Sequence, residues 1–218
     1  TLHISPRLVN FARVRELSAY GLRTAVGQIA QLVINRMDLT VVGIFAGIQF
    51  VTFYSVGSVL VGYAVTACYL VAFVFTPQLT QLEAKSDREG FLYALYKGLR
   101  LSGTLAAAIA AGLIVFGKSF LSLWVGAKYV ESHWNSRSDL IMLVLLLGNA
   151  PRLLQSVSRQ ALYATARVRF LMWLDVSEAI GNIVLSVIFV RHIGPIGVAL
   201  GTLIPLVVTQ IFVLLPYF

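Results

Sequence analysis

The sequence predicts an all-α integral membrane protein, built as a bundle of six transmembrane helices. Of the 218 residues, 58% are hydrophobic and only 12% are charged, and the mean hydropathy is +0.84. A soluble domain has about a quarter of its residues charged. The apolar runs recur along the whole chain, so a signal peptide does not account for them. They also lack the period-two alternation that a membrane β-barrel requires.

Six apolar segments are long enough to cross a bilayer, whose hydrocarbon core of about 30 Å takes roughly 20 helical residues. We place the spans near 22–46, 52–76, 99–117, 139–164, 170–190 and 195–216. Residues 1–21 form a basic amphipathic lead-in before them. Pro151 and Pro205 are expected to kink or break two of the spans. The chain lacks an initiator Met and stops within an apolar run, so we expect it to be a piece of a longer polypeptide.

Basic residues are distributed unequally between the two sides of the predicted bundle. The lead-in and the connections 77–98 and 165–169, with the adjoining span edges, hold ten Lys and Arg residues, and the other side holds four. By the positive-inside rule both termini are predicted to be cytoplasmic. The net charge of +8 is therefore attributed to topology and not to nucleic-acid binding.

Six ionisable residues lie at hydrocarbon depth within the predicted spans: Arg36, Asp38, Arg152, Arg159, Asp175 and Glu178. Each costs about 2.5–3.5 kcal/mol at a helix centre, which is too much for all of them to face lipid. At about 100° per residue, three spans gain one polar face each. The faces comprise Thr24, Gln28, Gln31, Asn35 and Asp38; then Arg152, Gln155, Ser156, Arg159 and Tyr163; and then Asp175, Glu178, Asn182 and Ser186. This pattern favours a bundle around a polar cavity.

The short connection 165–169 makes spans four and five an antiparallel pair, so residues equally far from it lie at similar depth. Arg159 then faces Asp175 or Glu178, and we predict an ion pair there. Arg152 lies at the depth of the neutral Asn182, which leaves it available for an anion. In the alternative interpretation, all of these pairs only hold a closed bundle together.

The stretch "NRMDLTVVG" places Arg36 and Asp38 two residues apart on one helix, where their side chains point about 160° apart and do not pair. Asp38 continues the polar face of the first span and is expected to line or close the outer end of the cavity. Arg36 lies at the edge of that face, so it either reaches into the cavity or is held by a neighbouring helix.

Other chemistry is sparse. His3, His133 and His192 are widely spaced and lack a Cys partner, so no metal site is expected. The chain shows no Gly-rich phosphate loop or Ser-centred elbow, and neither an enzyme activity nor a cofactor is predicted. Asp175 and Glu178 could form an acid/base pair, but their spacing near two arginines favours a salt-bridged or proton-coupling role.

The chain resembles the polysaccharide and O-antigen flippases of the multidrug/oligosaccharidyl-lipid/polysaccharide exporter superfamily. The resemblance rests on an ordered series of loose motifs: "INRMDLTVVGIFAGIQFVTFYSVGSVL", "FVFTPQLTQLEAKSDREG", "GKSFLSLWVGAKY", "RLLQSVSRQALYATARVRF" and "GPIGVALGTLI". Members of that superfamily consist of two six-helix bundles. The resemblance therefore implies that this chain is one half of such a transporter.

The resemblance also implies a function: translocation of an undecaprenyl-pyrophosphate-linked oligosaccharide across the bacterial inner membrane by alternating access, for cell-surface polysaccharide assembly. An anionic head group needs arginines and a glycan needs neutral hydrogen-bonding groups. The expected substrate-binding residues are Arg36, Arg152 and Arg159 for the head group, and Gln28, Gln31, Asn35 and Gln155 along the glycan path. Asp38, Asp175 and Glu178 are expected to form coupling or structural ion pairs. The expected partners are the lipid-linked glycan, membrane lipid and the other half of the transporter.

Two alternatives stay open on the sequence alone. A cation-coupled multidrug exporter of the same superfamily would depend on the acids and not on the arginines. A non-transporting membrane scaffold would have its charges paired internally, without a cavity that solvent can reach.

Overall fold

The computed structural model describes residues 11–214, apart from the side chains of residues 11–13 and 16, and all regular elements in this range are helical. The predictions for residues 1–10, which include His3, and for residues 215–216 of the last span lie outside the described residues. In chain order the elements are α1 (Phe11–Val41), the π-helix η2 (Val42–Ala46), α2 (Ile48–Ala84), α3 (Arg88–Val125), the 3-10 turn η3 (Ala127–Tyr129), α4 (Ser138–Leu154), α5 (Ser156–Ala164), α6 (Val168–Ile193), α7 (Pro195–Val208) and the π-helix η4 (Thr209–Leu214).

The helices confirm the predicted all-α membrane bundle. Within the described range, five helical segments are long and apolar enough to cross a membrane, and the pair α4–α5, bent by 43°, gives a sixth when it is taken as one span. The predicted fourth span, 139–164, therefore contains a break, in line with the kink or break expected in it. The break falls at Gln155, whose backbone leaves helical geometry at φ −101° and ψ 16°, four residues after Pro151. A proline in a helix removes one backbone donor and crowds the turn before it, so Pro151 alone does not account for a break that lies after it.

Two helices extend far beyond the predicted spans. α2 has 37 residues and α3 has 38, which corresponds to about 55 Å each at 1.5 Å per residue. Most of the connection 77–98 is therefore helical, and only a tight turn around Ser86 separates the two helices. The Asp87 carboxylate ends this turn by accepting the Gly90 N–H at 2.9 Å, as a helix cap. Similarly, α1 begins at Phe11, within the predicted lead-in.

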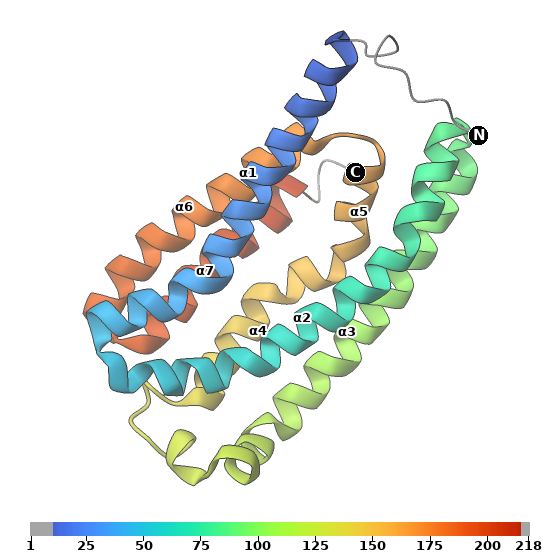
Figure 1. Ribbon diagram of the computed structural model, residues 1–218. Coiled ribbons are helices and arrows are strands. Elements are labelled where there is room, and N and C mark those ends of the chain that lie inside the picture. The colour runs from blue at the N-terminus through green and yellow to red at the C-terminus, as the bar shows by residue number, and fades with distance from the viewer. Residues whose placement is uncertain (1–10, 215–218) are drawn as a thin grey trace, which may run out of the picture.

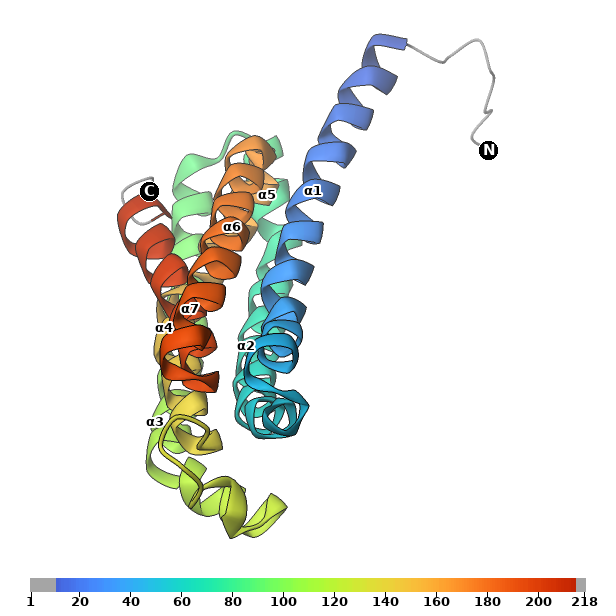
Figure 2. The same ribbon diagram turned by 90° about the vertical axis from the view of Figure 1, so that its left-hand side faces the viewer.

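The helices form two layers (Figures 1 and 2). One layer contains α1, α6 and α7, and the other contains α2, α3 and the broken pair α4–α5. α4 and α7 pack closely where the layers meet, because Gly148 leaves room for α7: a Cβ there would lie 2.8 Å from Leu203 Cα. On the other side of α7, Gly201 similarly faces the Ser186 backbone of α6. Small residues thus bring the backbones together.

The two layers separate between α1 and α2. These helices meet at η2 and Gly47, which has the positive φ of 115° that glycine adopts readily. From there they diverge toward the end of the bundle that holds the start of α1, the α2–α3 turn and the α5–α6 turn (Figure 1). We call this the basic end, after the predicted distribution of Lys and Arg, and the end with η2 the opposite end.

Candidate functional site

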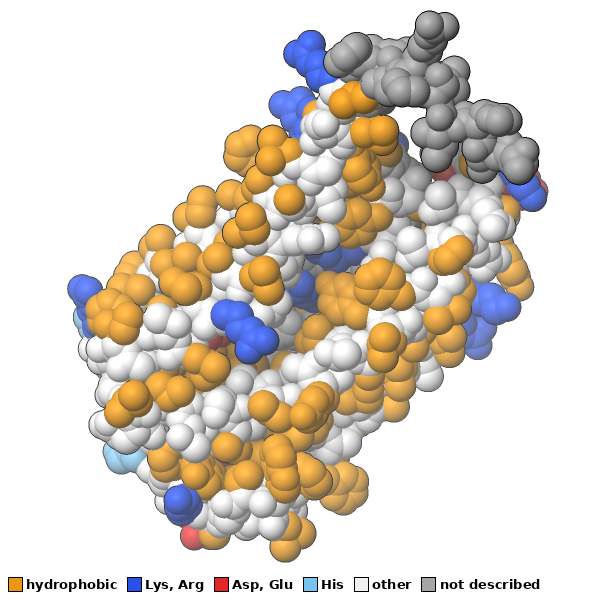
Figure 3. Space-filling view, viewed as in Figure 1, with side chains coloured by type: hydrophobic (Ala, Val, Ile, Leu, Met, Phe, Trp, Pro, Cys, Tyr) orange, Lys and Arg blue, Asp and Glu red, His pale blue; other side chains and the backbone are white. Residues whose placement is uncertain are grey.

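A cavity of about 480 Å³ lies between α1 and α2, with α4 and α7 as its floor. In Figure 3 the surface is hollowed between these two helices, and blue basic side chains are visible inside the hollow. Its polar lining comprises Asn35, Arg36, Asp38, Tyr54, Ser55, Ser58, Tyr63, Thr66, Asn149, Arg152 and Thr202. The cavity therefore combines two guanidinium groups with many hydroxyls and amides, and one carboxylate.

Arg152 lies at the floor of the cavity, in the last turn of α4, and only 5% of the residue is exposed. Its Nη2 donates to the Gln31 Oε1 of α1, and its Nε donates to the Tyr69 hydroxyl of α2 at 3.0 Å. The guanidinium also lies 5.7 Å from the centre of the Tyr69 ring. Within the described part of the chain, Arg152 has no carboxylate partner, so its charge is not neutralised by a direct ion pair.

Arg159 lies one helix further on, in α5, and its environment is different. Its Nη2 forms an ion pair with the Asp175 carboxylate of α6, and the two residues are 3% and 1% exposed. This is the ion pair expected from counting outward from the α5–α6 turn. Gln31 Nε2 also donates to Asp175 Oδ1, at 2.7 Å. Gln31 thus connects the two arginines: its oxygen accepts from Arg152 and its nitrogen donates to the partner of Arg159.

Glu178 is not the hydrogen-bonding partner of Arg159. Its Oε1 accepts from the Thr209 hydroxyl and from Gln210 Nε2, both at 2.6 Å. The Thr209 hydroxyl also lies 2.8 Å from the Pro205 carbonyl, the contact to the i−4 carbonyl that threonine often makes within a helix. Glu178 therefore ties α6 to the end of the last span.

Gln155 does not lie where the sequence predicts it. Its Nε2 donates to the Gln210 carbonyl of η4 at 3.1 Å, and Gln155 is not among the residues that line the cavity. The expected glycan-path role assumed one straight helix, on which Gln155 would share a face with Arg152. Because the chain bends at Gln155, its side chain is directed to η4 instead.

Asp38 lies at the end of the cavity nearer η2, and 7% of the residue is exposed. Its Oδ2 accepts from the Tyr54 hydroxyl of α2 at 2.7 Å and from the Thr202 hydroxyl of α7 at 2.8 Å, and its Oδ1 accepts from Asn182 Nδ2 of α6 at 3.2 Å. Asp38 thus links α1 to α2, α6 and α7 through one carboxylate. Its hydrogen-bond partners among the described residues are hydroxyl and amide groups, and none is a cation.

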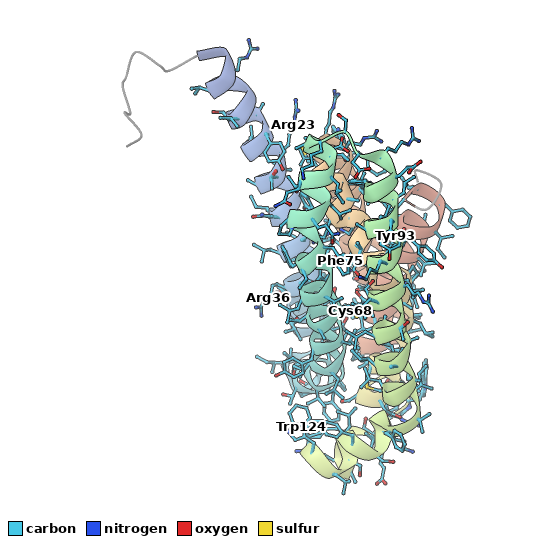
Figure 4. All side chains as sticks on the ribbon, turned by 90° about the vertical axis from the view of Figure 1, so that its right-hand side faces the viewer. Arg23, Arg36, Cys68, Phe75, Tyr93 and Trp124 are labelled. Atoms are coloured by element: carbon cyan, nitrogen blue, oxygen red, sulfur yellow. The ribbon has the colours of Figure 1, made fainter. Side chains whose placement is uncertain are left out.

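The remaining residues of the first span differ in their positions. Arg36 lines the cavity, is exposed, and has no hydrogen bond or ion pair with the residues that the structure describes. Figure 4 shows it at the outer edge of α1. Asn35 also lines the cavity, whereas Gln28 is exposed and does not. The cavity therefore has Arg152 at its floor and Arg36 at its rim.

Several residues of the site were not recognised from the sequence. Tyr54, Ser55, Ser58, Tyr69 and Thr202 lie in spans two and six, which read as apolar because their polar groups are single hydroxyls. Tyr54 and Ser55 belong to the motif "INRMDLTVVGIFAGIQFVTFYSVGSVL", which carries the family resemblance without assigning them a role. The signal that could have identified the polar face of α2 is a series of hydroxyl residues in its N-terminal half: Thr52, Ser55, Ser58 and Thr66.

Comparisons with known proteins agree with this architecture. A family model described as "Polysaccharide biosynthesis protein" matches residues 1–133, more than half of the chain. The chain is 23% identical over 210 residues to the "Probable low-salt glycan biosynthesis flippase Agl15" of Haloferax volcanii, a match that covers 93% of this chain and 42% of that protein. It is 28% identical over 121 residues to the "Uncharacterized membrane protein EpsK" of Bacillus subtilis, covering 56% and 24%. The chain thus spans less than half the length of these relatives. No solved structure matches it significantly.

Proposed function

This chain belongs to the polysaccharide biosynthesis protein family, and from that premise we propose that it is one half of a transporter for a lipid-pyrophosphate-linked oligosaccharide. The transporter moves its substrate across the bacterial inner membrane by alternating access, so that the glycan reaches the outer surface for polysaccharide assembly. Both termini and the basic end are then cytoplasmic, in accordance with the positive-inside rule. The name of the Haloferax relative, a probable glycan biosynthesis flippase, supports this assignment.

One observation carries the proposal: Arg152 is held at the floor of a polar cavity at membrane depth, with neutral partners only. A buried cation without a direct counter-ion is costly in a low-dielectric medium. An anionic substrate group supplies that counter-ion, and phosphate oxygens suit the planar donors of arginine. Arg36 at the rim is the second cation for the head group, whereas Arg159 already has Asp175 as its partner.

The neutral lining of the cavity suits the glycan. Asn35 on α1 and Ser55, Ser58 and Thr66 on α2 present amide and hydroxyl groups to the same space. Such groups exchange hydrogen bonds with sugar hydroxyls without the desolvation cost of a charge. Gln28 and Gln31 extend this polar face of α1 toward the basic end.

The proposal is tested by replacing the two cavity arginines. We expect Arg152→Ala and Arg36→Ala each to abolish translocation of the lipid-linked glycan in proteoliposomes and to stop surface polysaccharide production in a null strain, with protein levels unchanged. Lys118→Ala is the matched control, because Lys118 lies in α3 near the opposite end and does not line the cavity. Transport retained by both arginine variants would remove the proposal. Loss of transport on neutralising Asp38 or Glu178, with both arginine variants active, would favour a cation-coupled exporter.

A further inference from the structure

We propose that the Gln31 amide occupies the anion-binding position of Arg152, and that a phosphate group of the substrate displaces it and thereby releases α1 from α4. The inference rests on the proposed function, since it takes the substrate to carry a lipid-linked pyrophosphate. It assigns to Gln31 the role of a positioning residue that couples substrate binding to helix movement.

The first step concerns the strength of the two competing contacts at Arg152. The Gln31 carbonyl oxygen is a neutral acceptor, and the second partner of Arg152, the Tyr69 hydroxyl, is neutral as well. A phosphate oxygen bears charge and forms a shorter and stronger hydrogen bond with a guanidinium than an amide oxygen does. At Arg159 the acceptor is the Asp175 carboxylate, so a phosphate gains no such advantage. Arg152 is therefore the arginine at which exchange is favourable.

The second step concerns what Gln31 holds together. Its oxygen accepts from Arg152 on α4 and its nitrogen donates to Asp175 on α6. Of the hydrogen bonds between described side chains, two join α1 to the α2–α5 layer: Gln31 to Arg152, and Asp38 to Tyr54 near η2. When the phosphate takes Arg152, the Asp38–Tyr54 contact remains, so α1 stays joined to the α2–α5 layer at the opposite end and loses its side-chain bond to that layer at Gln31. The bond from Gln31 to Asp175 is kept, so α1 moves relative to α4 while it stays packed on α6.

The third step concerns the hinge for such a movement. α1 packs along α6 and meets α2 through the π-turn η2 and Gly47, which lies in the positive-φ region at 115°. α1 and α2 already diverge from this turn toward the basic end (Figures 1 and 2). A small rotation about η2 therefore becomes a larger displacement at the start of α1, which widens or narrows the cavity.

The chemical identity of residue 31 provides the test. An alanine removes the competitor of the phosphate, whereas a glutamate replaces it with a carboxylate that pairs with Arg152 permanently. We expect opposite effects on anion binding from these two substitutions. If Gln31 only stabilised the fold, both would act in the same direction. Gln78→Ala is the matched control, because Gln78 is an exposed glutamine on α2 that does not line the cavity.

Binding is measured with radiolabelled farnesyl pyrophosphate and the purified full-length polypeptide in phosphatidylcholine nanodiscs. We expect Gln31→Ala to tighten binding about threefold or more, because the cost of displacing the amide is removed. Gln31→Glu weakens it by about tenfold or more, because the anion must now compete with a carboxylate. Arg152→Ala abolishes binding, and Gln78→Ala leaves it unchanged. Inorganic pyrophosphate, tested in parallel, should give the same order of variants, since the contact is to the phosphate.

Release of α1 is measured as the distance between spin labels at Leu22→Cys on α1 and Tyr93→Cys on α3, in a Cys68→Ser background. Both labelled positions are 68% exposed, and Figure 4 shows Tyr93 on α3 and Arg23, the neighbour of Leu22, on α1. Farnesyl pyrophosphate should change this distance in the wild type. Gln31→Ala and Arg152→Ala should show the changed distance without the probe, and Arg152→Ala should not respond to it.

The outcomes separate this inference from the proposed function. If Arg152→Ala binds the probe as the wild type does, the proposed role of Arg152 in substrate binding is wrong. If Arg152→Ala loses binding while Gln31→Ala and Gln31→Glu both weaken it, the proposed function stands and the displacement of Gln31 is overturned. A distance that stays constant in Gln31→Ala would likewise overturn the release of α1.

Discussion

Arg152 and Arg159 are seven residues apart and equally buried, yet their surroundings differ. Arg152 ends α4, lines the cavity and binds neutral oxygens of Gln31 and Tyr69. Arg159 lies in α5, outside the cavity lining, and is paired with Asp175. The bend at Gln155 lies between them and directs the two side chains into different environments. Two arginines on one polar face of a sequence can therefore have separate roles, one held for a ligand and one used to join helices.

The comparison of the two arginines predicts that the largest loss of stability follows when the Arg159–Asp175 ion pair is broken. Arg159→Gln leaves the Asp175 carboxylate buried without a cation, and we expect it to lower the free energy of unfolding by about 3–5 kcal/mol. The measurement is reversible unfolding in mixed detergent micelles. The double variant Arg159→Leu/Asp175→Leu should regain most of the loss, because it removes both charges. If the double variant is as unstable as Arg159→Gln, the ion pair stabilises the fold by more than the neutralisation of one buried charge by the other.

A smaller loss is expected at the carboxylate near the opposite end. The Asp38 carboxylate accepts hydrogen bonds from Tyr54, Asn182 and Thr202. In Asp38→Asn one carboxylate oxygen becomes an amide NH2 group, which cannot accept a hydrogen bond, so at least one of these donors loses its acceptor. We expect the free energy of unfolding to fall by about 1–3 kcal/mol. Asp87→Asn is the control, since an asparagine caps a helix as well as an aspartate does. An unchanged stability of Asp38→Asn would mean that the carboxylate carries a proton in the folded protein.

A still smaller change is expected at Arg152. Arg152→Gln loses its hydrogen bonds to Gln31 and Tyr69 but also removes a buried charge that has no direct counter-ion, and these two effects oppose each other. We therefore expect a loss of about 1 kcal/mol, although binding of the anionic substrate is lost. Thermal unfolding and probe binding are measured on the same preparation. A loss of stability as large as that of Arg159→Gln would remove the distinction between the two arginines.

The smallest effect on stability is expected at the rim. Arg36 is exposed and has no partner among the described side chains, so Arg36→Ala should change the free energy of unfolding by no more than about 0.5 kcal/mol. Transport should nevertheless be lost, as proposed above. Thermal unfolding of Arg36→Ala beside the wild type checks this expectation. A clear destabilisation would place Arg36 among the residues that hold the bundle together.

The sequence predicted the Arg159–Asp175 ion pair because some constraints are local. A short turn fixes two neighbouring helices as antiparallel, so counting outward from residues 165–167 placed Arg159 beside Asp175. Helical periodicity placed Gln155 on one face with Arg152, and this grouping was not retained because the helix breaks at Gln155. Counting gives depth but not partners: Asn182 contacts Asp38 and Thr202, and Arg152 contacts Gln31 of α1 and Tyr69 of α2.

By itself the sequence determined that the chain spans a membrane with helices, approximately where its apolar segments lie, and which charges fall within those segments. These properties follow from hydropathy and helical periodicity, which depend on residues close together in the chain. Only the tertiary structure decided which arginine faces the cavity, which is neutralised, and that Gln31 joins them. These outcomes depend on the bend at Gln155 and on how far α1 and α2 diverge, since both set the direction in which a side chain points.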